Sequence, residues 1–81
     1  MRVTIRLFAR LRELVGQGEL VRDLPAQSTV ATVWEHLAAE FPAVAPYAAS
    51  VSCAVNADYA RLTTVVREGD EIAFLPPVSG G

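Results

Sequence analysis

The sequence contains no lysine, only one cysteine and no long apolar run. A single cysteine cannot form an internal disulfide, which excludes a secreted domain held together by disulfide bonds. No segment approaches the roughly 18 consecutive apolar residues that a membrane-spanning helix needs. Residues 1–6 alternate charged and apolar side chains and lack the apolar core of a signal peptide. We therefore expect a cytoplasmic protein without a membrane partner.

The chain of 81 residues is long enough for one small domain with a compact core. Its net charge of −2 argues against a nucleic-acid partner. The charge is unevenly distributed, because residues 1–22 hold five arginines and two glutamates, whereas residues 23–81 hold two arginines and seven acids. Such asymmetry is typical either of a docking surface or of a solvated face.

The spacing of apolar residues predicts a series of short strands and two helices. The expected order is a strand at 2–8, a short helix at 9–15, a strand at 19–24, a long helix from Val30 to Phe41, an irregular connector at 43–50, and strands at 51–55, 59–63 and 71–75. Ser28 or Thr29 is placed to cap the long helix, and Pro42 ends it. This order predicts an α+β roll, a mixed sheet packed on one main helix. The right-handed crossover rule places the first and last strands side by side and parallel at its centre.

The usual catalytic side chains occupy unpromising positions. His36 lies on the polar side of the long helix, and Cys53 shares a strand face with apolar residues, so we expect a solvated imidazole and a buried thiol. The acidic residues 68–71 match no calcium loop and are typical of a polar turn. Ser79 has no following helix, as a nucleophile elbow requires. Metal-ligand spacings are absent from the sequence, so we expect no metal site.

Two features remain unexplained. The chain ends in Pro76-Pro77-Val78-Ser79-Gly80-Gly81, where two prolines end the last strand and terminal glycines would let the carboxylate of Gly81 enter a narrow channel. A frayed terminus is the alternative interpretation. In addition, Phe8 and Leu75 fall on the polar side of two strands expected to be neighbours, and Tyr59 could join them in an exposed apolar patch. Coverage of that face by the short helix is the alternative.

The segment Phe8-Ala9-Arg10-Leu11-Arg12-Glu13-Leu14-Val15-Gly16 and the end Phe74-Leu75-Pro76-Pro77-Val78-Ser79-Gly80-Gly81 resemble the small subunits of molybdopterin synthase. The resemblance covers essentially the whole chain. It implies a ubiquitin-like β-grasp domain at residues 1–75 and an extended tail at residues 76–81.

The resemblance also implies a function as a sulfur carrier. A ubiquitin-activating-like adenylyltransferase would use ATP to adenylate Gly81, a sulfur atom would displace AMP, and the resulting thiocarboxylate would convert cyclic pyranopterin monophosphate to molybdopterin. The chain itself would bind no cofactor, and catalytic side chains would belong to the large subunit, its partner in a heterotetramer. The tail would comprise Ser79, Gly80 and Gly81, and the partner interface Phe8, Arg12, Tyr59, Leu75, Pro76 and Pro77. Leu75 and Tyr59 differ from the residues common at these positions in the family, phenylalanine and an aliphatic residue.

Three alternatives remain open at this point. The first is a sulfur carrier for another pathway, such as thiamine synthesis or tRNA thiolation, and the second is a protein modifier whose Gly81 is joined to target lysines. The third is a binding module that contacts RNA through four arginines, Arg2, Arg6, Arg10 and Arg12. Only one aromatic residue, Phe8, is interleaved with these arginines, which makes them a weak nucleic-acid footprint.

Overall fold

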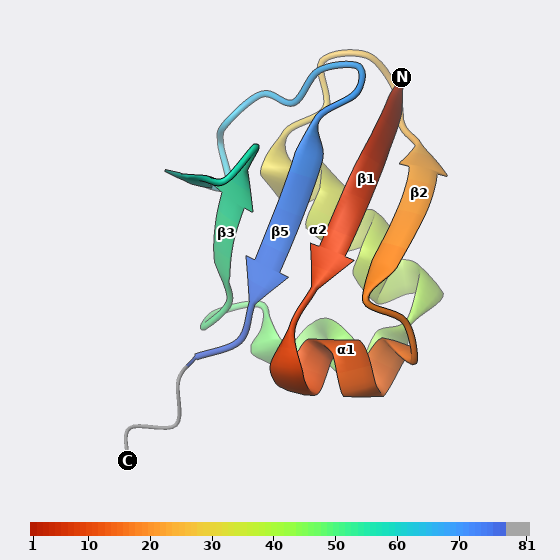
Figure 1. Cartoon of the computed structure of the whole chain (residues 1–81), viewed down its shortest axis with the longest axis vertical. Coiled ribbons are helices and arrows are strands. Elements are labelled where there is room, and N and C mark those ends of the chain that lie inside the picture. Colours follow the sequence, from red (N-terminus) through yellow and green to blue (C-terminus); the bar gives the residue numbers. More distant parts are fainter. Residues whose placement is uncertain (78–81) are drawn as a thin grey trace.

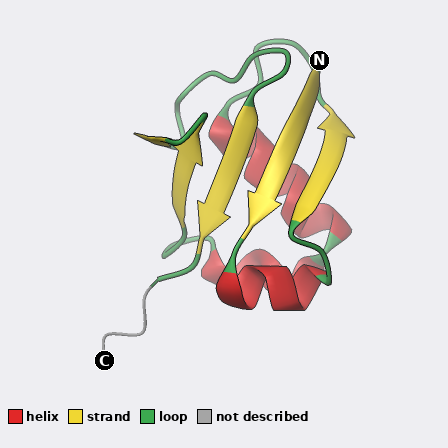
Figure 2. Cartoon of the chain, viewed as in Figure 1, coloured by secondary structure: helices red, strands yellow, loops and turns green. Residues whose placement is uncertain are grey.

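A computed structural model describes residues 1–77. Its five strands form one mixed sheet in the order β2-β1-β5-β3-β4, and a long helix crosses one face of that sheet (Figures 1 and 2). The strands are β1 (Arg2–Leu7), β2 (Glu19–Asp23), β3 (Ser52–Val55), β4 (Asp58–Ala60) and β5 (Glu71–Leu75). The helices are α1 (Ala9–Val15), α2 (Val30–Glu40) and the 3-10 helix η1 (Pro42–Tyr47). No helix within residues 1–77 is both long and apolar enough to cross a membrane.

The central pair of the sheet consists of β1 and β5, which run parallel with Ile5 opposite Ile72 and Leu7 opposite Phe74. The predicted parallel pairing of the first and last strands is therefore confirmed. Because the two strands are parallel, both end at the same edge of the sheet. That edge carries α1 and the exit of the chain from β5, whereas the N-terminus lies at the opposite end (Figure 1).

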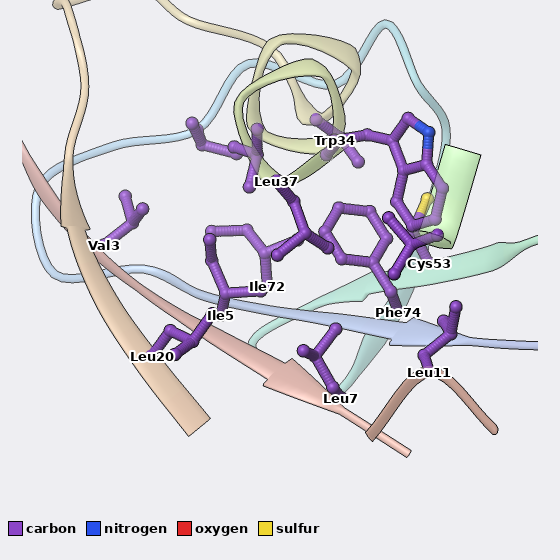
Figure 3. Packing of buried hydrophobic residues seen from close by; sticks show 14 of the residues in the cluster. Val3, Ile5, Leu7, Leu11, Leu20, Trp34, Leu37, Cys53, Ile72 and Phe74 are labelled. Atoms are coloured by element: carbon purple, nitrogen blue, oxygen red, sulfur yellow. The ribbon is translucent and has the colours of Figure 1, made fainter. Parts of the chain in front are cut away.

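The core lies between the sheet and α2, and period-two alternation selects which strand residues enter it. Val3, Ile5 and Leu7 of β1 are buried, as are Ile72 and Phe74 of β5. Figure 3 shows these side chains in one cluster with Trp34 and Leu37 of α2. The intervening residues of each strand, among them Arg6, Ala54 and Ala73, belong to the other face, which no helix covers in Figure 1.

Local signals set the ends of α2. Thr29 is the N-cap, and its side chain accepts a hydrogen bond from the backbone N–H of Thr32. Ser28 instead donates its hydroxyl to the carbonyl of Pro25, 2.7 Å away. The helix ends at Glu40, one residue before the predicted end at Phe41. Pro42 follows and stops it as predicted, since proline cannot continue the backbone hydrogen-bond pattern. The connector predicted to be irregular begins as η1, and this interpretation was therefore wrong for residues 43–47. Val44 in η1 is fully buried, and this packing accounts for the order of the segment.

The strand predicted at residues 59–63 is also displaced. β4 spans Asp58–Ala60, and the chain turns at residues 62–63. The carbonyls of Leu62 and Thr64 accept hydrogen bonds from the N–H groups of Ala31 and Val30, both at 2.9 Å. The first N–H groups of a helix have no partner within the helix. The segment therefore leaves the sheet and satisfies two such donors at the start of α2.

Candidate functional site

The exit of the chain from β5 is built into the centre of the sheet. β5 pairs with β1 on one side and with β3 on the other, and Leu75 is its last residue, opposite Ser52. Pro76 and Pro77 follow without regular structure. Proline has no N–H to donate to a neighbouring strand, so the hydrogen-bond ladder ends there. The remaining predicted tail residues, Ser79, Gly80 and Gly81, lie outside the described residues.

A hollow on the open sheet face lies beside this exit. We call it the sheet hollow; it has a volume of about 250 Å³ and is lined by Phe8, Ala54, Ala57, Tyr59, Ala73 and Leu75. Ala54 faces Ala73 across β3 and β5, and it also faces Tyr59 across β3 and β4. The small side chains of Ala54 and Ala73 thus leave a depression among the larger side chains of Phe8, Tyr59 and Leu75. Tyr59 is 89% exposed, and Phe8 is 39% exposed.

The hairpin between β3 and β4 positions Tyr59. Asn56 and Ala57 adopt φ angles of 50° and 73°, the left-handed conformation that two-residue hairpin turns require. The side-chain amide of Asn56 donates to Asp70 Oδ1, and its Oδ1 accepts from the backbone N–H of Glu71, both at 3.0 Å. The hairpin is therefore tied to the start of β5.

A second, larger hollow lies on the other side of Phe8 and Leu75. We call it the tail hollow; it measures about 570 Å³ and is lined by Phe8, Ala9, Arg10, Tyr47, Leu75, Pro76 and Pro77. Phe8 and Leu75 contribute to both hollows. The structure thus brings together five of the six residues predicted from the sequence to form an interface, namely Phe8, Tyr59, Leu75, Pro76 and Pro77.

Phe8 reaches the open face because it precedes α1 in an extended conformation, with φ −128° and ψ 155°. It therefore continues the alternation of β1 by one residue. The guanidinium carbon of Arg6 lies 5.7 Å from the centre of its ring, within the range of a cation–π contact. Nη1 of Arg6 also lies 3.7 Å from Oε1 of Glu71 on β5. Arg6 thus links Phe8 to the neighbouring strand.

Arg12, the sixth predicted interface residue, lines neither hollow. Its side chain lies over Gly18, where an added Cβ would stand 3.2 Å from Nε of Arg12. Arg10 occupies the rim of the tail hollow instead and donates to Oε2 of Glu13 at 3.0 Å. Hydrogen bonds to Glu13 and to Tyr47 raise the pKa of Arg10, which stays charged. The sequence did not predict Tyr47 as a lining residue, because it lies in η1, a segment that was expected to be an irregular connector.

The candidate reactive side chains outside the hollows are either buried in the core, exposed to solvent or part of a turn. Cys53 is buried, its Sγ donates to the carbonyl of Ala60 at 3.2 Å, and burial raises the pKa of the thiol. His36 is exposed on α2. The predictions of a buried thiol and a solvated imidazole are both confirmed. In the acidic turn, Asp70 accepts from the backbone N–H of Arg67 at 2.8 Å, as expected of a polar turn. Within residues 1–77, no three metal-ligating side chains gather at one place.

A mixed sheet that wraps one helix, with its C-terminal strand at the centre and an exit beside apolar hollows, defines a ubiquitin-like β-grasp protein. The model of the ThiS family matches residues 5–81, and the chain belongs to that family. Two relatives are molybdopterin synthase sulfur carrier subunits. That of Arabidopsis thaliana is 35% identical, with 98% of this chain and 82% of the relative covered, and that of Escherichia coli K12 is 36% identical, with 98% and 99% covered. The predicted resemblance is confirmed.

Solved structures agree with this assignment. SAMP1 from Haloferax volcanii, a small archaeal modifier protein, is 28% identical and superposes with a TM-score of 0.90 over the full length of both chains. A chain in the complex of subunits 1 and 2 of molybdopterin-converting factor from Helicobacter pylori is 22% identical, with a TM-score of 0.70 and full coverage of both chains. The second likeness concerns the fold alone. Together these similarities confirm the predicted β-grasp fold.

Proposed function

We propose that this chain is the sulfur carrier subunit of a molybdopterin synthase and carries sulfur as a thiocarboxylate on Gly81. The observation that supports this most directly is the position of the chain's exit, which leaves the central strand β5 between two apolar hollows. The end of β5 can then present a reactive group while the neighbouring surface docks on a partner. The names of the relatives at 35% and 36% identity support the same pathway.

The proposed chemistry uses the terminal carboxylate rather than a side chain. A ubiquitin-activating-like adenylyltransferase joins the Gly81 carboxylate to the α-phosphate of ATP and releases pyrophosphate. Persulfide sulfur attacks the acyl carbon and expels AMP, and a thiol then cleaves the sulfur–sulfur bond to leave the thiocarboxylate. ATP is consumed by the activating enzyme, and the chain itself holds no cofactor.

The large synthase subunit is the proposed docking partner of the surface around the two hollows. The large synthase subunit covers the hollows and contacts Phe8, Tyr59 and Leu75, and the segment from Pro76 to Gly81 enters its active site and delivers sulfur to cyclic pyranopterin monophosphate. Two such carriers and two large subunits form the heterotetramer, with Arg12 at the edge of the contact. Because adenylation draws on ATP, the proposed location is the cytoplasm.

The test is the intact mass of the protein after incubation with ATP, a sulfur donor and the activating enzyme of its host. We expect a gain that matches the replacement of one oxygen by one sulfur, and we expect a variant that lacks Gly81 to show none. A second incubation adds the large subunit and the pyranopterin, and molybdopterin should form. No mass gain with an enzyme that is active on another carrier would contradict the proposal.

A protein modifier is the second candidate, because the superposition with SAMP1 covers both chains completely. In that function Gly81 forms an isopeptide bond with a lysine of a target. Immunoblots of host cells that express a tagged chain distinguish the two candidates. A modifier produces high-mass conjugates that disappear on deletion of Gly81, whereas a carrier dedicated to sulfur produces none. A carrier for thiamine or tRNA thiolation would gain sulfur but fail to form molybdopterin.

A further inference from the structure

Two alanines in the walls of the hollows have a backbone conformation that favours glycine. Ala9, with φ 50°, lines the tail hollow, and Ala57, with φ 73°, lines the sheet hollow. For a residue with a Cβ atom, the left-handed region is disfavoured by a clash with the following carbonyl oxygen. Glycine has no such penalty. Each of these positions therefore places a methyl group at a site where it opposes folding.

The chain uses glycine at other turns of this kind. Gly16 and Gly69 have φ angles of 86° and 83°, and a Cβ added at either would meet no atom within 4 Å. At these two positions the chain has no methyl group and carries no such strain. At Ala9 and Ala57 it keeps the methyl group, although both residues are exposed and bury little surface within the chain. Packing inside the free protein therefore does not offset the strain.

Strained residues of this kind cluster at functional sites. We propose that the methyl groups of Ala9 and Ala57 are contact points for apolar side chains of the large subunit, so that docking recovers what the free chain loses. This inference rests on the proposed function. The occupant is apolar because no charged residue lines the sheet hollow, and Arg10 at the rim is the one charged residue of the tail hollow.

The proposal makes stability and affinity change in opposite directions. Ala9→Gly and Ala57→Gly each remove the backbone strain and should raise the thermal unfolding midpoint by a few degrees. Each should also weaken binding to the large subunit about threefold to fourfold, the effect of one methyl group removed from a buried contact. The double variant should lose about tenfold, because separate sites contribute additively. General damage to the fold would instead lower both quantities.

Gln27 provides the matched control. It has φ 67° but lines neither hollow, so Gln27→Gly should raise the unfolding midpoint without changing the affinity. The measurements are calorimetric unfolding and titration calorimetry of the full chain with the large subunit of the same host. Equal affinity of wild type and both alanine variants would overturn this inference and leave the proposed function intact. Failure of the wild type to bind the large subunit would overturn both.

Discussion

Trp34 and Phe74 meet edge to face, with ring centres 5.0 Å apart and an angle of 69° between the ring planes. The first ring comes from α2 and the second from β5, the strand that leads to the tail, and Figure 3 shows them in contact within the core. Aromatic pairs in this geometry gain about 0.5–1.5 kcal/mol beyond the burial of their surface. The contact therefore anchors the strand that leads to the tail.

Phe74→Ala should remove a large part of the stability of the domain. Phe74 is fully buried, and truncating a buried phenylalanine to alanine costs about 3–5 kcal/mol in lost contacts and cavity formation. Urea unfolding followed by tryptophan fluorescence measures the change. Phe8→Ala, which truncates a ring on the exposed face, should cost less than about 1.5 kcal/mol. Equal losses for the two variants would contradict the division into a core face and a docking face.

Phe8→Asp should leave the fold intact and abolish docking on the large subunit. A carboxylate at the edge of both hollows would have to lose its hydration when a partner covers it, so we expect at least a thirtyfold loss of affinity by calorimetry, roughly the effect of losing a hot-spot residue. Val21 is 47% exposed on the same sheet face but lines neither hollow. Val21→Asp is therefore the matched control and should bind normally.

Cys53→Ala should keep full sulfur loading in the mass assay. The thiol is buried, and its raised pKa leaves little reactive thiolate. In the same way, iodoacetamide should modify Cys53 slowly in the folded chain and rapidly in urea. A Cys53→Ala variant that folds but gains no sulfur would show that the cysteine relays sulfur, contrary to the proposed chemistry.

The Arg22–Glu40 pair should make stability depend on pH. The guanidinium of Arg22 donates to both carboxylate oxygens of Glu40, with 2.8 Å between Nε and Oε1, and these hydrogen bonds hold the pKa of that carboxyl below its ordinary value of 4.5. A carboxyl with a lowered pKa in the folded state stabilises the fold fully above its unfolded pKa. This contribution is lost as the pH falls below 4.5 through the folded pKa.

The measurement is the urea midpoint of wild type and Glu40→Gln at several pH values. We expect a higher midpoint for the wild type at pH 7, and the difference should shrink as the pH falls below 4.5. Glu35→Gln serves as the control, because Glu35 lies exposed on the same helix and forms no ion pair within residues 1–77. A difference that does not change with pH would show that the ion pair contributes nothing to folding.

Period-two alternation of apolar residues allowed the central strands of the sheet to be predicted from the sequence. The buried series of β1 and β5 was visible as alternating apolar residues, and the same alternation placed Phe8 and Leu75 on the opposite face. The crossover rule then predicted the parallel central pair. The sheet hollow itself was not predictable, because it depends on the register that sets Ala54 opposite Ala73. The apolar pattern within one short strand does not determine its register with a strand that is distant in the sequence.

Tertiary contacts account for the remaining differences. β4 ends early because the carbonyls of Leu62 and Thr64 accept hydrogen bonds from the first turn of α2. These contacts join distant parts of the chain, so the local sequence could not predict them. Tyr47 enters the tail hollow because η1 folds around the buried Val44. Whether Arg10 or Arg12 lines the tail hollow depends on the direction in which α1 leaves Phe8. Both arginines look alike in the motif, and the rotation of a seven-residue helix about its axis decides which one reaches the hollow.

The position of β5 between two neighbouring strands also has a mechanical consequence. A force applied beyond Pro77 acts along β5 and loads its hydrogen bonds to β1 and β3 in shear. These bonds resist together, whereas the bonds of an edge strand pulled sideways would break one after another. The β-grasp domain should therefore stay folded under a pull on its C-terminal end that would detach an edge strand.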